Sequence, residues 1–223
     1  AGVPGVVHTV HGLHEQEPWY GPALKRWAGR HTDATVAVSA PLHDYLVRVA
    51  RLPAGRVHTV INGVDVRRFA PGPRTGALAA RLGLPNDRRL VGTVARLAPV
   101  KNQALLVEAF ARAAARHPDA DLVFVGTGEL REALGAQAAA LGVAGRVHFP
   151  GAVADTPPAY RDLDVFALPS FAEGTSMSVL EAMSTGLPVV ATAVGGTPHL
   201  LDGGRCGLLV PSGDAGALAA ALD

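Results

Sequence analysis

Residues 165–196, VFALPSFAEGTSMSVLEAMSTGLPVVATAVGG, decide the fold of this chain. An apolar run, Val165–Leu168, leads into a loop of small residues, a helical segment containing Glu181, and a second apolar run, Val189–Ala191. Short apolar runs without polar alternation are typical of strands that are buried on both faces of a parallel sheet. The stretch therefore predicts two parallel strands joined by a helix.

The same alternation of strands and helices extends in both directions along the chain. Further strands are expected at Val6–Val10, Thr35–Val38, Val57–Ile61, Leu90–Ala95, Leu122–Val125, Val147–Phe149 and Gly207–Val210. Asn102 is expected to cap a helix that runs to about Arg116, and helices are also expected to start at Asp155-Thr156-Pro157 and at Asp214. This order predicts an α/β fold with a doubly wound parallel sheet and ligands at the carboxyl ends of its strands.

One segment, residues 62–73, is predicted to link two domains. It begins with the turn-forming Asn62-Gly63-Val64-Asp65 and ends in a stretch rich in arginine and proline. About three strands precede it, too few for a doubly wound domain, whereas the six that follow make a complete one. We therefore expect a partial domain over residues 1–65 and a complete domain over residues 66–223.

Composition excludes several classes of protein. The 223 residues are 48% hydrophobic and 17% charged, which is typical of a globular chain, and the net charge of +1 provides no overall field for nucleic acid. A single cysteine, Cys206, excludes an internal disulfide framework. Neither a signal peptide nor an apolar run of about 18 residues is evident. Because the chain opens on a strand-like run without an initiator Met, we expect it to begin inside a larger protein.

The segment Glu173–Glu181 is the first candidate for chemistry. A strand-to-helix turn of small residues exposes unpaired backbone N–H groups at the positive end of a helix, where phosphate binds. Glu173, before the helix, is placed to accept hydrogen bonds from sugar hydroxyls, and Glu181, one turn in, to hold a vicinal diol such as that of ribose. A structural interpretation competes with this one, because Ser178 and Glu181 have the spacing of a capping box.

The second candidate is the loop between the predicted strand ending near Ala95 and the helix starting at Asn102. It places Arg96 and Lys101 at the carboxyl edge of the sheet. An arginine fork and a lysine point charge beside a helix start suit a diphosphate. The competing interpretation is two solvated loop cations.

Two other patterns point to weaker hypotheses. Gly126-Thr127-Gly128-Glu129 resembles the start of a dinucleotide fingerprint, but Arg131 stands where the third glycine belongs, so we expect a tight turn into a helix with Glu129 in its first turn. His8, His11 and His14, with Glu15 and Glu17, suggest a metal site, but neighbours at odd spacing on a strand face opposite sides. We therefore expect no metal, and we expect His11 to face a cleft at a strand end.

A basic and aromatic stretch, from Trp19 to Arg30, has two interpretations. It is suited to contact a membrane surface or a lipid-linked substrate, or to pack against the rest of its domain.

Several segments together resemble the family-4 retaining glycosyltransferases. The resemblance covers nearly the whole chain and is strongest in Val60–Asp65, Gly92–Asn102, Val125–Gly128, Val147–Gly151 and Leu168–Gly196. The pattern that joins Glu173 to Glu181 across seven residues, followed by Ala182–Thr192 and Val194–Gly196, is specific in combination. The resemblance implies a GT-B fold, with two Rossmann-like domains and a cleft between them.

The resemblance also implies roles for individual residues. Arg96 and Lys101 match the family's diphosphate-binding pair, Glu173 the carboxylate near the donor sugar, and Glu181 the carboxylate that bonds the ribose. Backbone groups at Gly174, Thr175 and Ser176 are expected near the phosphates and sugar, and Gly151 and Val153 near the base. His11 matches a first-domain histidine near the reacting sugar. Such a site requires no metal and no other cofactor.

The expected function is transfer of a hexosyl unit, with retention, from a UDP- or GDP-linked sugar to a glycan, a lipid-linked saccharide or another metabolite. The missing part of the first domain leaves the activity of this chain on its own open. We expect it in the cytoplasm, at most peripheral to the inner face of the membrane. The alternatives are a nucleotide-sugar epimerase or phosphorylase on the same fold, and a non-catalytic nucleotide-sugar binding module; a Rossmann oxidoreductase is more distant.

Overall fold

The computed structural model describes residues 3–12 and 19–223, whose strands form two parallel sheets. The strands are β1 (Val7–Val10), β2 (Ala34–Ala37), β3 (Val57–Thr59), β4 (Arg89–Val94), β5 (Ala120–Val125), β6 (Val147–Gly151), β7 (Val165–Leu168), β8 (Val189–Thr192) and β9 (Leu208–Val210). The first three form the smaller sheet in the order β1-β2-β3, and the other six form the larger sheet in the order β6-β5-β4-β7-β8-β9.

Helices follow most of the strands. They are α1 (Gly21–Arg30), α2 (Ala40–Arg48), α3 (Ala77–Leu82), α4 (Gln103–Ala113), α5 (Arg131–Ala140), α6 (Pro157–Asp162), α7 (Met177–Ser184), α8 (Thr197–Leu200) and α9 (Ala215–Leu222), with short 3₁₀ turns η1 (Ala54–Arg56), η2 (Pro99–Lys101), η3 (Ala144–Arg146) and η4 (Asp202–Gly204).

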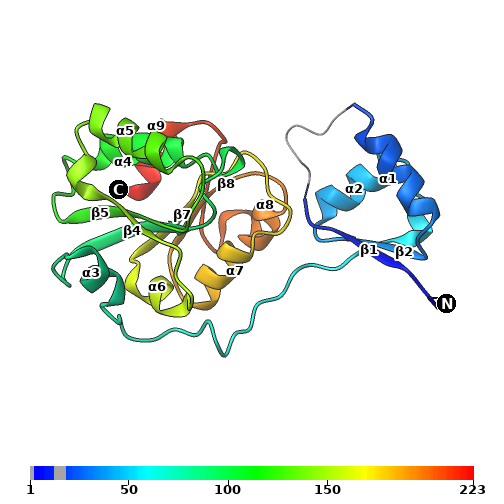
Figure 1. The fold of residues 1–223 in the computed structure, drawn as a ribbon, viewed down its shortest axis with the longest axis horizontal. Helices are drawn as coiled ribbons and strands as arrows, with labels where there is room; N and C mark the ends of the chain where they lie inside the picture. The colour runs from blue at the N-terminus through cyan, green and yellow to red at the C-terminus, as the bar shows by residue number, and fades with distance from the viewer. Residues whose placement is uncertain (1–2, 13–18) are drawn as a thin grey trace.

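The larger sheet is covered on both faces. Figure 1 shows α4, α5 and α9 over one face and α3, α6 and α7 over the other. Every residue of β5 is buried, and side chains alternate along it between two cores: Leu122 and Phe124 belong to one, Val123 and Val125 to the other. Burial on both faces is why the strands read as continuous apolar runs.

The order of the larger sheet reverses between β4 and β7. The chain moves outward from β4 to β5 and β6, then returns to the other side of β4 and continues through β7 to β9. The loops after β4 and β7 therefore leave in opposite directions and open a crevice at the carboxyl ends of these strands. The expected doubly wound sheet is confirmed, and its switch point is where a ligand site is expected.

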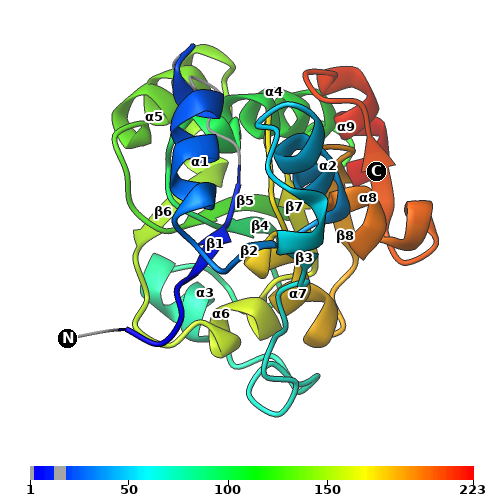
Figure 2. The same ribbon diagram turned by 90° about the vertical axis from the view of Figure 1, so that its right-hand side faces the viewer.

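The smaller sheet lies beyond the carboxyl ends of the larger one (Figures 1 and 2). Leu42 and Leu46 of α2 are buried against it, and Figure 1 shows α1 and α2 on the same side of its strands. Between Thr59 and Ala77 the chain forms neither helix nor strand as it passes to the larger unit. The division at residue 65 stays a prediction.

The nine expected strands are all present, and three local expectations are corrected. The strand at Val57 ends at Thr59 rather than Ile61, because its partner β2 ends at Ala37. Asn102 precedes α4 in the left-handed conformation (φ 48°), so its side chain does not cap the helix. Glu129 lies outside α5, whose first turn contains Glu132 instead. Asp214, by contrast, caps α9 as expected, accepting from the Ala217 N–H at 2.8 Å.

One buried carboxylate, that of Asp162, joins α6 to the start of α3. Asp162, at the end of α6, is 1% exposed and accepts four hydrogen bonds. Its donors are the Thr75 N–H (2.6 Å) and hydroxyl (2.9 Å), the Gly76 N–H (2.9 Å) and the Leu78 N–H (2.8 Å). The Gly76 and Leu78 N–H groups stand at the start of α3, where no earlier turn supplies acceptors. Asp162 thus caps α3 from a distant helix.

We expect Asp162→Ala to lower the free energy of unfolding by about 3–5 kcal/mol, because it leaves buried donors without an acceptor. The thermal midpoint, followed by circular dichroism, should fall by roughly 10 °C. Asp155→Ala is the matched control: Asp155 is 66% exposed and pairs with Arg68 at the surface, so its loss should shift the midpoint by less than about 3 °C. Equal shifts for the two variants would contradict this role for Asp162.

Candidate functional site

Two loops meet at the switch point between β4 and β7. The first continues β4 through Arg96 and forms η2, which ends at Lys101. The second follows β7 and leads into α7. The Phe171 N–H donates to the Val100 carbonyl at 2.9 Å, so the loops are joined through their backbones. The Gln103 side chain donates to the Arg96 carbonyl at 2.8 Å and holds the first loop onto α4.

The turn after β5 supports the first of these loops. Gly126 has a φ of 143°, and a Cβ placed there would lie 2.0 Å from the Ala95 carbonyl oxygen. Only glycine allows the two backbones to approach so closely. The glycines that resemble a dinucleotide fingerprint therefore serve to seat the loop that carries Arg96.

Lys101 and Glu173 form an ion pair across the two loops. Lys101 Nζ lies 2.7 Å from Glu173 Oε1, and the Ser170 hydroxyl donates to the same oxygen at 2.6 Å. The Glu173 side chain is 8% exposed and that of Lys101 is 24% exposed. Burial strengthens such a pair relative to one at the surface. The contacts fix one oxygen of Glu173, and no described residue donates to the other, Oε2, which can accept from a ligand.

The amino end of α7 lies beside this pair. Ser176 is the N-cap, and its hydroxyl accepts from the Val179 N–H at 3.4 Å. The capping-box interpretation of Glu181 is therefore wrong, because the cap is two residues earlier than Ser178. The Glu181 carboxylate instead accepts from the Tyr160 hydroxyl at 2.6 Å.

These groups surround one cavity of about 390 Å³. Its lining contains seven residues of the predicted site: His11, Arg96, Lys101, Glu173, Thr175, Ser176 and Glu181. It also contains Asn62, Val94, Ala95, Met177 and Ser178, to which sequence analysis assigned no site role. Arg96 is exposed and its guanidinium has no partner among the described residues. The cavity thus offers two cations, two carboxylates and a helix amino end to a polar ligand.

The remaining predicted residues lie off this cavity. Gly174 lines a smaller neighbouring hollow of about 150 Å³, which it shares with Glu173. Val153 lines another hollow, with Arg81 and Asp155, and Gly151 lies at the end of β6. Gly151 and Val153 are not among the described residues that line the cavity around Glu173, and their assignment to the base stays a prediction.

The smaller unit closes one side of the cavity through close backbone contact. A Cβ on Gly174 would lie 2.1 Å from the His11 carbonyl oxygen and 3.0 Å from Val38. The Thr175 hydroxyl donates to the Val38 carbonyl, and the Asn62 side chain donates to the Thr175 carbonyl at 3.3 Å. The segment after β3 thereby brings Asn62 into the site. Two sequence signals could have revealed it: its position directly after a predicted strand, and its place in the Val60–Asp65 segment that carries the family resemblance.

The metal hypothesis rests partly on His14, Glu15 and Glu17, which lie outside the described residues. Within residues 3–12 and 19–223, no group of three or more His, Cys, Asp or Glu side chains is placed to hold a metal ion.

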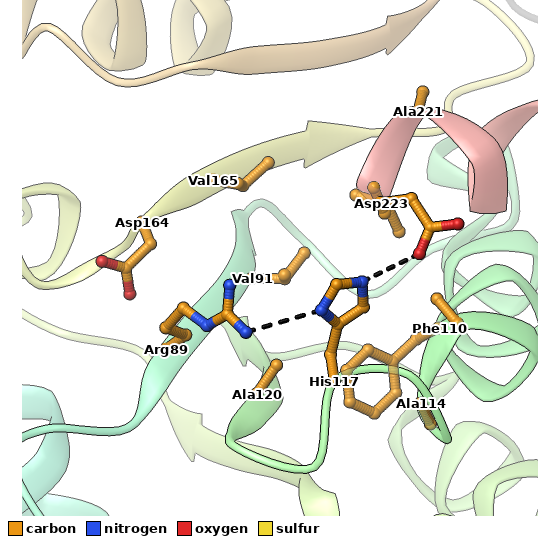
Figure 3. Close-up of a pocket in the computed structure, with 12 residues that line it drawn as sticks. Arg89, Val91, Phe110, Ala114, His117, Ala120, Asp164, Val165, Ala221 and Asp223 are labelled. Carbon is orange, nitrogen blue, oxygen red and sulfur yellow. Dashed lines mark hydrogen bonds and ion pairs between the residues drawn. The ribbon is translucent and has the colours of Figure 1, made fainter.

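A second cavity, of about 220 Å³, lies at the amino ends of β4, β5 and β7, away from the carboxyl ends where the first cavity lies (Figure 3). Arg89 Nη2 lies 3.4 Å from His117 Nδ1, and His117 Nε2 lies 2.8 Å from Asp223 Oδ1. Hydrogen bonds from Arg116 and His117 lower the pKa of the Asp223 carboxyl. These charged groups pair with one another and hold the end of α9 to the segment after α4. None of the predicted site residues lies here.

Two models of known protein families match the chain. The model of "Glycosyl transferases group 1" matches residues 88–223, and that of "Glycosyltransferase Family 4" matches residues 1–68. The chain belongs to the group 1 glycosyltransferases. The resemblance to family 4 is confirmed, and the boundary between the two matches falls within the part of the chain that joins the two sheets.

Two curated relatives show what share of a longer protein this chain matches. The D-inositol 3-phosphate glycosyltransferase of Rhodococcus jostii is 34% identical over 229 residues, which cover 94% of this chain and 50% of that protein. The GDP-mannose-dependent alpha-(1-6)-phosphatidylinositol monomannoside mannosyltransferase of Mycolicibacterium smegmatis is 35% identical over 236 residues, covering 100% of this glycosyltransferase chain and 61% of that protein. The chain thus spans roughly half the length of these curated relatives.

Solved structures confirm the GT-B fold. HepE from Anabaena, in complex with UDP and glucose, superposes with a TM-score of 0.88 at 27% identity over 97% of this chain and 60% of that one. Sucrose-phosphate synthase from Thermosynechococcus elongatus superposes with a TM-score of 0.81, also at 27% identity, over 97% of this chain and 57% of that one. In the described part of the glycosyltransferase chain, every helix is too short or too polar to traverse a bilayer.

Gly174→Ala should push the smaller unit away from the cavity, because its methyl group would overlap the His11 carbonyl. We expect a loss of about 1–3 kcal/mol in unfolding free energy, as for other overpacked sites, together with a larger radius of gyration in small-angle scattering. Gly135→Ala is the matched control: nothing lies within 4 Å of its added methyl, and in a helix the change should stabilise by about 0.5–1 kcal/mol. An unchanged radius for Gly174→Ala would contradict the expected separation.

Proposed function

We propose that the protein is a retaining glycosyltransferase that transfers a hexosyl unit from a UDP- or GDP-linked sugar to a glycan, lipid-linked or metabolite acceptor. The observation that carries the proposal is the single cavity shared by Arg96, Lys101, Glu173, Glu181 and the amino end of α7. HepE, which is similar over nearly the whole chain, binds UDP and glucose, and this likeness supports a nucleotide-sugar donor.

The cations and the helix end suit the leaving group of such a reaction. When the bond between the sugar and the diphosphate breaks, its electron pair moves onto the diphosphate oxygen. Arg96 offers a planar fork of donors, Lys101 a compact charge, and α7 its unpaired N–H groups. Charges that are already in place stabilise the transition state without reorganisation.

The carboxylates suit the hydroxyl groups of the donor. The cavity lining carries two cations and two carboxylates besides His11, so an incoming diphosphate should contact Arg96 and Lys101 while the carboxylates accept from hydroxyls. We propose that Glu173 Oε2 accepts from the donor sugar and that Glu181 accepts from the ribose. We assign His11 to the vicinity of the reacting sugar, and the Gly151–Val153 segment to that of the base.

Retention is proposed without a protein nucleophile. Glu173 Oε1 is held by Lys101 and Ser170, and Oε2 is the oxygen assigned to a hydroxyl of the donor sugar, so neither oxygen is assigned an attack on the sugar carbon. The acceptor oxygen would instead bond to the sugar carbon on the face that the diphosphate leaves, and its proton would pass to the departing phosphate oxygen. With the leaving charge met by side chains and a helix end, we expect transfer to persist in the presence of EDTA.

We expect Lys101→Met and Arg96→Met each to weaken binding of UDP or GDP about 10- to 100-fold in calorimetry, because each removes a charge-assisted contact to phosphate. Arg205→Met is the control. The Arg205 side chain is 79% exposed, against 24% for Lys101, and it lies outside the cavity. The Arg205→Met variant should therefore bind UDP or GDP as tightly as the wild type does. Equal affinities for all four proteins would remove the basis of the site assignment.

Product analysis on the full-length protein separates the proposed activity from its alternatives. Incubation with donor and acceptor should yield a transferred sugar, and Glu173→Ala should abolish that product. Epimerised donor without acceptor would indicate an epimerase, and phosphate-dependent release of a sugar phosphate would indicate a phosphorylase. Tight nucleotide binding without any turnover would indicate a binding module.

We also propose that α1 contacts the inner face of the membrane in the cytoplasm. Leu24 and Trp27 of α1 are 57% and 62% exposed, Trp19 just before the helix is 93% exposed, and Arg30 at the end of the helix is exposed. Aromatic and basic side chains on one helix are typical of interfacial anchors. A lipid-linked acceptor, as in the name of the mannosyltransferase relative, is consistent with such a position.

The two tryptophans of the chain both belong to this surface, so tryptophan fluorescence reports on it alone. We expect the emission to shift to the blue when vesicles of anionic phospholipid are added, because the indole rings leave water. Vesicles of zwitterionic lipid should give a smaller shift, and Leu24→Glu should abolish the shift with anionic vesicles. Emission that stays constant with all vesicles would exclude membrane contact through α1.

A further inference from the structure

The side-chain carboxylate of Glu181 has a single partner among the described residues. Its Oε2 accepts from the Tyr160 hydroxyl at 2.6 Å, whereas Oε1 accepts from no described group. Glu181 is half-buried and lines the cavity beside Ser178. One oxygen of the carboxylate is therefore tied to the protein, and the other remains for a ligand.

Tyr160 is held rigidly by its surroundings. It is 0% exposed, and its ring lies 5.8 Å from that of Phe69 in an edge-on contact and 5.9 Å from that of Phe166. Its helix, α6, is anchored by the four hydrogen bonds of Asp162 and by the Arg161 side chain, which donates to the Ala70 carbonyl at 3.2 Å. The hydroxyl thus has one position, set by packing rather than by its hydrogen bond.

Glu181 lacks comparable restraint of its own. It lies in the second turn of α7, beyond the Ser176 cap, and a glutamate side chain has three rotatable bonds that give it several orientations. A rigid donor to one oxygen selects one of these orientations before any ligand arrives. Selection of this kind lowers the entropy lost on binding.

We propose that Tyr160 is a positioning residue: through its hydrogen bond to Glu181 Oε2 it presents Glu181 Oε1 as the acceptor for the vicinal diol of the donor ribose. The inference rests on the proposed function, because it requires a nucleotide in the cavity. It goes beyond that function by adding Tyr160 of α6. This residue acts through Glu181 and touches no ligand itself.

The protonation state of Tyr160 suits this task. Burial, and then the hydrogen bond to Glu181, raise the pKa of its hydroxyl far above the usual range. The hydroxyl therefore remains a donor throughout the working pH range of an enzyme. Below the raised pKa it retains its proton, so the bond to Glu181 should be insensitive to alkaline pH.

The test compares a nucleoside diphosphate with its 2′,3′-dideoxy counterpart, using UDP or GDP according to which the wild type binds. We expect the wild type to bind the ribonucleotide about tenfold more tightly than the dideoxy form. Tyr160→Phe keeps the ring and removes only the hydroxyl. It should weaken the ribonucleotide about 5- to 10-fold and leave the dideoxy form within about twofold, so most of the preference disappears.

Two further variants separate positioning from a structural role. Phe69→Leu loosens the same aromatic cluster but retains the hydroxyl, so it should lower the thermal midpoint and keep the preference for ribose. Glu181→Ala removes the carboxylate that Tyr160→Phe leaves unpaired. In that background, adding Tyr160→Phe should change neither affinity by more than about twofold. The double variant thus tests the coupling even if Tyr160→Phe alone folds poorly.

The possible results separate failure of the positioning role from failure of the proposed function. Equal weakening of both nucleotides by Tyr160→Phe, or no weakening of either, would overturn the positioning role while the proposed function stands. A wild type that binds both nucleotides equally would overturn the ribose assignment of Glu181 together with that role, and leave the diphosphate contacts intact. A wild type that binds neither nucleotide would overturn the proposed function itself.

Discussion

The ion pair between Lys101 and Glu173 is the interaction on which the site depends. It joins residues 72 positions apart, one from the loop after β4 and one from the loop after β7. These are the two strands between which the sheet changes direction, so their loops diverge. A backbone hydrogen bond from Phe171 to Val100 also joins the two loops. Together the two contacts make a cation and a carboxylate from separate loops part of the wall of a single cavity.

Close approach of backbones keeps that wall in place. The turn at Gly126 brings β5 against the Ala95 carbonyl, and the turn at Gly174 brings the smaller unit against the loop after β7. A side chain at either position would overlap a carbonyl oxygen. The glycines therefore have a steric role in seating the loops around the cavity, which differs from the phosphate-cradling role that glycine-rich turns suggest.

Buried polar groups connect the site to the fold. Asp162 caps α3 and anchors α6; α6 carries Tyr160; and Tyr160 bonds Glu181 on α7. Each of these contacts satisfies a group that would be costly to bury alone. The orientation of the Glu181 carboxylate thus depends on the end of α6, where Asp162 caps α3 close to Tyr160. The hydrogen bonds that hold α6 to α3 and the one that orients the Glu181 carboxylate are therefore linked through α6.

Local patterns in the sequence determined a large part of this protein. Strands buried on both faces produce apolar runs, so all nine were predicted, and the pattern around Glu173 and Glu181 identified the family. The tertiary structure decided which groups meet. Tyr160 carries no local signal, because its partner is 21 residues away on another helix, and Asn62 reaches Thr175 across 113 residues. Capping was also misjudged at Asn102 and Ser178, since a cap depends on backbone angles that neighbouring elements impose. Spacing along the chain governs contacts within one element, whereas contacts between elements follow from strand order and packing.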